Sequence, residues 1–116
     1  MYQRTTIIGY LGSDPEQRFT GEGKAVTSFS VAVSDRKDDT TWFRVTVWDQ
    51  QAEACAQYLH KGSPVLVEGR LQHDQSGNPK TFQRKDGTWS ASFELTASQV
   101  KFLPGKGDAQ EQEVAF

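Results

Sequence analysis

Hydrophobic and polar side chains alternate along much of this chain, and a period of two residues is typical of β-strands with one buried face. In residues 25–33, Phe29, Val31 and Val33 fall on one face and small side chains fall on the other. Gly, Pro, Asp and Ser residues separate the alternating segments and favour turns between them. The pattern predicts strands over residues 5–11, 25–33, 40–49, 64–71 and 89–95, the last continuing in apolar residues to 103.

One segment has the helical period instead. Its apolar residues follow the i, i+3, i+4, i+7 spacing of one buried helix face: Ala52, Cys55, Ala56 and Leu59. Asp49 is a suitable N-cap, Gly62 is a suitable left-handed stop, and Pro64 prevents continuation. We therefore expect a single helix over residues 50–60.

The predicted order is three strands, one helix and two strands. This is the order of an all-β, five-stranded Greek-key barrel of the OB type, with the helix between strands 3 and 4. A long polar stretch contains turn signals at residues 76–79 and 85–87. These signals predict a protruding β-hairpin in the 73–88 region.

The net charge of −2 resides at the end of the chain. Residues 1–103 carry twelve basic and twelve acidic side chains, whereas residues 104–116 carry Lys106 against three acidic residues. We expect residues 1–103 to form one domain and residues 104–116 to form a short, flexible acidic tail. A neutral body excludes a simple polycation that holds nucleic acid by charge alone, so local patches and non-ionic contacts would have to contribute.

Length and composition narrow the class of protein. A chain of 116 residues suits one small domain. No apolar run approaches the ~20 residues of a membrane span, and the start of the chain lacks a signal-peptide pattern. Cys55 is the single cysteine, so no disulfide can form within the chain, which fits a reducing compartment. We expect a cytoplasmic protein.

The strand predicted at residues 40–49 carries the strongest functional signal. Alternation directs Phe43, Val45 and Val47 to the core. The outward side chains are then Trp42, Arg44, Thr46 and Trp48. Aromatic faces stack on unpaired bases for about 1 to 3 kcal/mol each, and an arginine between them can neutralise a phosphate or stack beside them. We interpret this face as a site for single-stranded nucleic acid; the alternative is that a subunit partner or a long loop covers a tryptophan.

Basic residues flank this face in the sequence. They are Arg36 and Lys37 before it, Arg70 on a later strand, and Lys80, Arg84 and Lys85 around Phe82 in the hairpin region. An aromatic ring among cations on a protruding arm suits the wrapping of a nucleic-acid strand. Acidic residues are interspersed among them, so the alternative is a loop that is merely solvated.

Signatures of catalysis and of cofactor binding are lacking in the sequence. His60 and His73 have no second ligand at metal-binding spacing. Cys55 falls on the apolar helix face, and the glycines do not form a phosphate-binding loop. We expect no enzyme activity, no metal and no cofactor.

The end of the chain is acidic and closes on an aromatic residue with a free carboxylate. The residues concerned are Glu111, Glu113, Val114, Ala115 and Phe116. Such a motif can seat Phe116 in an apolar pocket of a partner while a basic rim takes the carboxylates. The alternative is a frayed terminus without a role.

The ordered combination of these segments resembles the bacterial single-stranded DNA-binding protein family. The resemblance covers most of residues 4–103 and includes IGYLG at 8–12, FSVA at 29–32, TWFRV at 41–45, YLHKG at 58–62 and VEGRL at 67–71. It implies an OB fold that forms dimers and usually homotetramers, and that wraps single-stranded DNA without sequence preference. It also implies that Trp42 and Trp48 stack on bases, that Phe82 is a further stacking residue, and that the acidic tail docks replication and repair proteins.

The chain departs from the family pattern at several places. The stretch at residues 35–39 lacks an aromatic that many members carry, so one stacking platform is either absent or supplied by Tyr10 or Trp89. Ala115 stands where proline is typical, and the linker before the tail is short. Phe43 stands where the family often has histidine near a subunit contact.

These observations support one leading hypothesis and one alternative. The first is sequence-independent binding of single-stranded DNA by a nucleoid-associated oligomer that protects DNA in replication, recombination and repair. The alternative is an adaptor on the same scaffold, resembling primosomal protein B, that binds other replication proteins.

Overall fold

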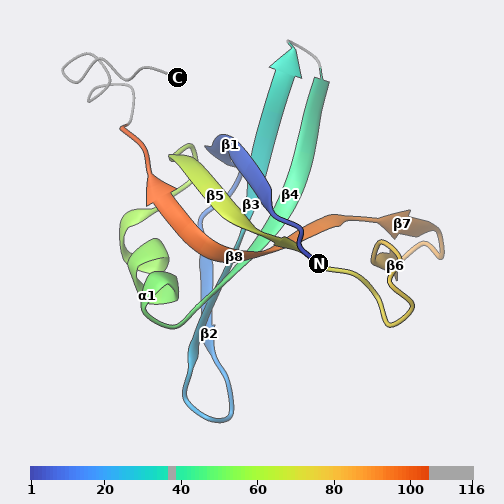
Figure 1. The fold of residues 1–116 in the computed structure, drawn as a ribbon, viewed down its shortest axis with the longest axis horizontal. Coiled ribbons are helices and arrows are strands. Elements are labelled where there is room, and N and C mark those ends of the chain that lie inside the picture. The colour runs from blue at the N-terminus through green and yellow to red at the C-terminus, as the bar shows by residue number, and fades with distance from the viewer. Residues whose placement is uncertain (37–38, 105–116) are drawn as a thin grey trace.

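The computed structural model of the chain describes residues 1–36 and 39–104, and strands dominate it (Figure 1). The elements in order are β1 (Thr5–Leu11), β2 (Glu16–Phe19), β3 (Ala25–Arg36), β4 (Asp39–Trp48), α1 (Asp49–Tyr58), β5 (Pro64–Leu71), β6 (Thr81–Gln83), β7 (Trp89–Ala91) and β8 (Phe93–Phe102). The strands predicted at residues 5–11 and 64–71 have the expected bounds. The strand predicted at residues 25–33 is longer and continues to Arg36.

The strands close into a barrel. The hydrogen-bonded order is β1-β5-β8-β4-β3, and β1 also pairs with β3 through Tyr10 and Leu11, which completes the ring. β4 and β8 run parallel, while the other neighbouring pairs run antiparallel. The predicted OB-type barrel, with its helix between the third and fourth barrel strands, is confirmed. β2 extends the sheet by a hairpin with β3.

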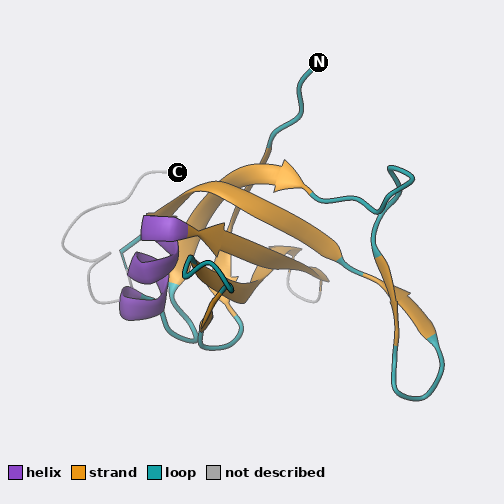
Figure 2. Cartoon of the chain, turned by 90° about the horizontal axis from the view of Figure 1, so that it is seen from below, coloured by secondary structure: helices purple, strands orange, loops and turns teal. Residues whose placement is uncertain are grey.

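The core consists of the inward side chains that the alternation predicted. Fully buried members of it are Val31, Val45, Val65, Val67 and Leu95. Burying one such side chain contributes about 1.5–3 kcal/mol. α1 packs at one end of the barrel, as Figure 2 shows, and adds Ala52 and Cys55 to the core. The buried Thr27 hydroxyl donates a hydrogen bond to the Ala52 carbonyl oxygen at 2.6 Å, which fixes the helix against β3.

The start and the end of α1 differ from the expected bounds. The helix spans Asp49–Tyr58, and Trp48, not Asp49, occupies the N-cap position, without a side-chain hydrogen bond. Asp49 has a φ of 61°, because the chain turns sharply from β4 into the helix. Aspartate tolerates this left-handed region better than most residues do. The helix ends early because Leu59 is extended, although Gly62 has the left-handed conformation expected for it.

The predicted hairpin arm is present, but it occupies only the second half of the 73–88 region and extends beyond it to Ala91. Its strands are β6 and β7, joined by a turn in which the Arg84 amide donates to the Thr88 carbonyl oxygen at 2.7 Å. The first turn signal forms a separate loop, because the Asp74 carboxylate accepts hydrogen bonds from the amides of Ser76 and Asn78, each at 2.9 Å. Only the second turn signal therefore connects two strands. The arm projects away from the barrel (Figure 2).

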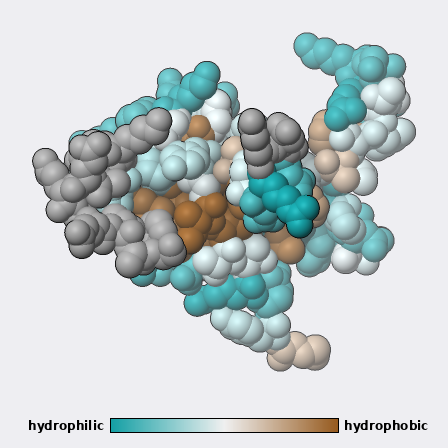
Figure 3. Space-filling view, turned by 90° about the horizontal axis from the view of Figure 1, so that it is seen from above, coloured by the Kyte–Doolittle hydropathy of each residue, from teal (hydrophilic) through white to brown (hydrophobic). Residues whose placement is uncertain are grey.

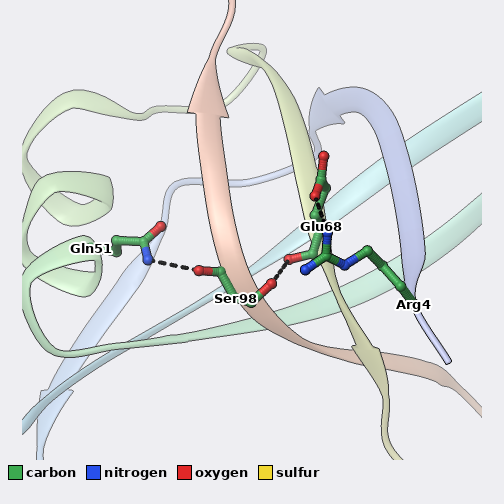
Figure 4. A network of polar contacts seen from close by, with 4 residues as sticks. All are labelled: Arg4, Gln51, Glu68 and Ser98. Atoms are coloured by element: carbon green, nitrogen blue, oxygen red, sulfur yellow. Dashed lines mark hydrogen bonds and ion pairs between the residues drawn. The ribbon is translucent and has the colours of Figure 1, made fainter. Parts of the chain in front are cut away.

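A polar network joins α1 to β8 and β5 (Figure 4). The register of β5 and β8 shifts after Glu68, and Ser98 lies in the resulting bulge. The Gln51 side chain donates to the Ser98 carbonyl oxygen at 3.0 Å and accepts from the Val100 amide at 2.9 Å. The Ser98 hydroxyl donates to the Glu68 carbonyl oxygen at 3.0 Å, and Arg4 forms an ion pair with the Glu68 carboxylate at 3.1 Å. Side chains thus bond the backbone groups that a bulge takes out of the strand ladder.

Burial of Cys55 predicts a loss of stability at alkaline pH. Desolvation raises the pKa of its thiol from 9.0 to about 11. The unfolded chain therefore loses this proton at lower pH than the folded chain, and the free energy of unfolding falls as pH rises through that interval. We expect this fall to be steeper in the wild type than in Cys55→Ala, measured by urea unfolding at a series of pH values. Equal pH dependence of the two proteins would contradict the assignment.

Candidate functional site

β4 presents the predicted aromatic and basic residues on the outside of the barrel. Val45 and Val47 point into the core, whereas Trp42 and Trp48 are 53% and 42% exposed. Arg44 lies between them in the sequence and is exposed as well. The predicted alternation is confirmed. In the described part of the chain, both indole rings are therefore partly open to solvent.

Trp42 and Arg44 line a groove of about 430 Å³. Its lining residues are Ser30, Trp42, Phe43, Arg44, Phe82, Ser92 and Glu94. Phe82 belongs to the arm, so this groove, called the arm groove below, lies where the arm meets the barrel. The structure thus brings three predicted site residues from two separate segments to one cavity.

Tyr10 lies on the same outer face as Trp42. In the strand register Tyr10 is opposite Ala32, and Ala32 is opposite Trp42. The three residues therefore form a row across β1, β3 and β4, with a small side chain between two aromatic rings. Tyr10 is exposed.

The two faces of the arm separate Phe82 from Trp89. Phe82 is opposite Ser90, whereas Trp89 is opposite the next residue along β6, so the two rings point to opposite faces. Arg84 accompanies Phe82: its guanidinium carbon lies 6.0 Å from the ring centroid, and Nη2 donates to the Ser90 hydroxyl at 3.0 Å. Trp89 is exposed but does not line the arm groove.

The turn of the arm is held by its own acidic residue. The Thr88 hydroxyl donates to the Asp86 carboxylate at 2.7 Å, and the Thr88 amide donates to it at 3.0 Å. These hydrogen bonds lower the pKa of Asp86. Lys85 lies in the same turn, exposed at the tip of the arm.

A second groove, of about 500 Å³, lies beside the base of the arm and contains two more predicted residues. Its lining residues are Gln3, Arg70, Leu71, Gln72, His73, Lys80 and Thr96. Lys80 donates to the Gln72 side-chain oxygen at 2.9 Å, and Gln72 donates to the Thr96 hydroxyl. Arg70 and Lys80 are thus brought together, in a different groove from Trp42.

The remaining predicted residues lie outside both grooves or outside the described residues. Trp48 is at the far end of β4, opposite Val26, and Arg36 is the last residue of β3. The residues outside the described part of the chain are Lys37, Glu111, Glu113, Val114, Ala115 and Phe116.

One residue of the arm groove was missed from the sequence. Glu94 is opposite Arg44 in the parallel pairing of β4 and β8, and it accepts a hydrogen bond from the Ser92 hydroxyl at 3.0 Å. The alternation of residues 89–95 puts Ser92 and Glu94 on one polar face, but only the pairing of distant strands puts that face next to Arg44. A carboxylate thus borders the arm groove.

Two observations concern the chemistry of the described residues, and a third concerns their helices. Residues 1–36 and 39–104 contain no group of three or more His, Cys, Asp or Glu side chains that could hold a metal ion. In the same residues the only ion pair joins Arg4 and Glu68, so the Arg44 charge is available to an anion. No helix in this part of the chain has the length and apolar character needed to cross a membrane.

Comparison with known proteins points to one family. The model of the single-strand binding protein family matches residues 2–103. A single-stranded DNA-binding protein of Neisseria meningitidis serogroup A is 35% identical over 113 residues, which cover 90% of this chain and 62% of the relative. A single-stranded DNA-binding protein of Clostridium tetani is 40% identical over 106 residues, covering 86% of this chain and 69% of the relative. The chain spans less than two-thirds of the length of the Neisseria relative.

Proposed function

Because the chain belongs to the single-strand binding protein family, we propose that it binds single-stranded DNA without sequence preference. The observation that carries the proposal is the arm groove, where Trp42 and Arg44 of β4 meet Phe82 of the arm. Each ring can stack on an unpaired base for about 1–3 kcal/mol, and Arg44 can bind a phosphate between them. Every base has a π face, so such contacts do not select a sequence.

Stacking also accounts for binding by a body without net charge. Residues 1–103 carry equal numbers of basic and acidic side chains, so counterion release alone would give weak binding. Local cations would bind phosphates at two places. Arg44 lies in the arm groove, and Arg70 and Lys80 lie in the second groove. Further contacts in this proposal are Tyr10, Arg36, Lys37, Trp48, Arg84, Lys85 and Trp89.

The proposal includes assembly into dimers, and of dimers into tetramers, through β1 and β5. Ile8 of β1 is opposite Leu66 of β5, both point away from the core, and Ile8 is 43% exposed. Residues 5–9 of β1 pair with β5 on one edge and, among the described residues, have no strand partner on the other edge. Figure 3 shows hydrophobic residues gathered in a patch on one face of the molecule. An open strand edge beside exposed apolar side chains suits pairing with a second copy.

The biological role follows from the same chemistry. We propose that the protein protects single-stranded DNA in replication, recombination and repair, in the cytoplasm at the nucleoid. Residues 1–103 would bind DNA, and the acidic residues 104–116 would dock other proteins of these processes. The family match over residues 2–103 and the charge imbalance beyond them support this division.

The arm groove predicts a large loss of affinity when both rings are removed. We expect Trp42→Ala combined with Phe82→Ala to weaken binding of a labelled oligothymidine by about a hundredfold or more, since two stacking contacts are lost. Fluorescence anisotropy at fixed salt concentration measures this affinity.

Tyr58→Ala is the matched control, because Tyr58 is an exposed aromatic residue on α1 that packs near Phe102 and lines neither groove. It should bind like the wild type. If the double variant bound oligothymidine like the wild type, the stacking assignment would be wrong. If the wild type itself bound poorly and instead captured a purified replication protein, the adaptor alternative would replace the proposal.

The carboxylate in the arm groove predicts a gain of affinity when it is neutralised. Glu94→Gln keeps an acceptor for the Ser92 hydroxyl but removes a charge that repels phosphates. We expect a roughly threefold increase in affinity at low salt, which shrinks at high salt as the charge is screened. Glu53→Gln, an exposed substitution on α1, is the control. Unchanged or weaker binding of Glu94→Gln would show that Glu94 does not face the DNA.

A further inference from the structure

Gly12 lies directly under the Trp42 indole. It follows β1 at the position after buried Leu11, so alternation directs it to the outer face. A Cβ placed on Gly12 would clash with Cζ3 of Trp42 and would lie 2.7 Å from its Cη2. The six-membered ring of the indole therefore rests against the Gly12 backbone, in space that any other residue would fill.

The backbone around Gly12 is held from several sides. The Gly12 amide donates to the Ser30 carbonyl oxygen at 3.0 Å. Leu11 next to it donates to the Ser63 carbonyl oxygen at 2.9 Å and accepts from the Gly62 amide at 2.8 Å. The backbone is thus fixed between β3 and the start of β5 and cannot withdraw from the ring. A side chain at position 12 would have to displace Trp42 instead.

Gly12 differs in this respect from the other crowded glycines. A Cβ on Gly9 would clash with the Ala32 carbonyl oxygen, and one on Gly69 would clash with the Thr96 carbonyl oxygen. Those two glycines are required by strands that pack closely, so substitution there would disturb the barrel. At Gly12 all three nearest atoms belong to the Trp42 ring, and the backbone conformation is open to other residues.

We propose that Gly12 is a positioning residue for base stacking: the absence of its side chain fixes where the Trp42 ring lies at the rim of the arm groove. This inference rests on the proposed function. Trp42 is 53% exposed, so one part of the ring rests on the Gly12 backbone while the rest is free for a base. A methyl group at position 12 moves the ring from this place without removing it, and so misaligns it relative to Arg44 and Phe82 across the groove.

The experiment compares Gly12→Ala with Gly21→Ala. A Cβ on Gly21 meets nothing within 4 Å, so this variant is a matched glycine-to-alanine control. We expect Gly12→Ala to bind labelled oligothymidine about tenfold more weakly than the wild type, because the contact of one base is impaired. Gly21→Ala should bind normally. Both variants should retain the wild-type far-ultraviolet circular dichroism and the same cooperative urea unfolding.

A second pair of variants separates positioning of Trp42 from a general effect on structure. In a Trp42→Ala background the ring is gone, so adding Gly12→Ala should change the affinity no further. An equal loss of affinity in the presence and absence of Trp42 would overturn the inference, as would wild-type binding by Gly12→Ala when Trp42→Ala binds weakly. If Trp42→Ala itself bound like the wild type, the stacking function would fail, which is a different result. If Gly12→Ala did not fold, adding Trp42→Phe, which shortens the ring, should restore folding; failure of this rescue would also overturn the inference.

Discussion

The two-residue period of β4 links the interior of the barrel to its outer surface. Val45 and Val47 are buried in the core, and their packing fixes which face of the strand points outward. A shift of β4 by one residue would turn Trp42, Arg44 and Trp48 into the core and expose the valines. The energy that holds the core together therefore also directs these aromatic and basic residues outward.

Sequence patterns predicted the parts of this protein that depend on local order. Alternation and turn residues were sufficient for β1, β3, β4 and β5, and the i, i+3, i+4, i+7 spacing was sufficient for α1. The strand predicted at residues 89–95 divides at Ser92 into β7 of the arm and β8 of the barrel. The hairpin was predicted, but its bounds were set too early. The first turn signal forms a local loop, in which Asp74 accepts hydrogen bonds from Ser76 and Asn78, and the pattern does not show which turn joins two strands.

The same limit applies to the candidate site. Trp42 and Arg44 follow from one strand, and Phe82 was recognised by its basic neighbours. The meeting of these residues depends on the register of β6 with β7, which separates Phe82 from Trp89, and on the parallel pairing of β4 with β8, which places Glu94 beside Arg44. Such pairings join residues that are distant in the sequence, so local periodicity does not predict them. The Gln51 network is a further case, since a helix side chain completes the hydrogen bonds of a bulge in β8.

The parallel pairing of β4 with β8 joins segments that are made at different times during synthesis of the chain. The segment that carries Trp42 and Arg44 is made early, whereas the residues that form the opposite wall, Phe82 and Glu94, are among the last of the barrel to be made. Parallel strands require a long crossover connection, and non-local pairing of this kind is slow to form. The arm groove can therefore form only after β6, β7 and β8 have been made, because Phe82 and Glu94 supply its wall opposite Trp42.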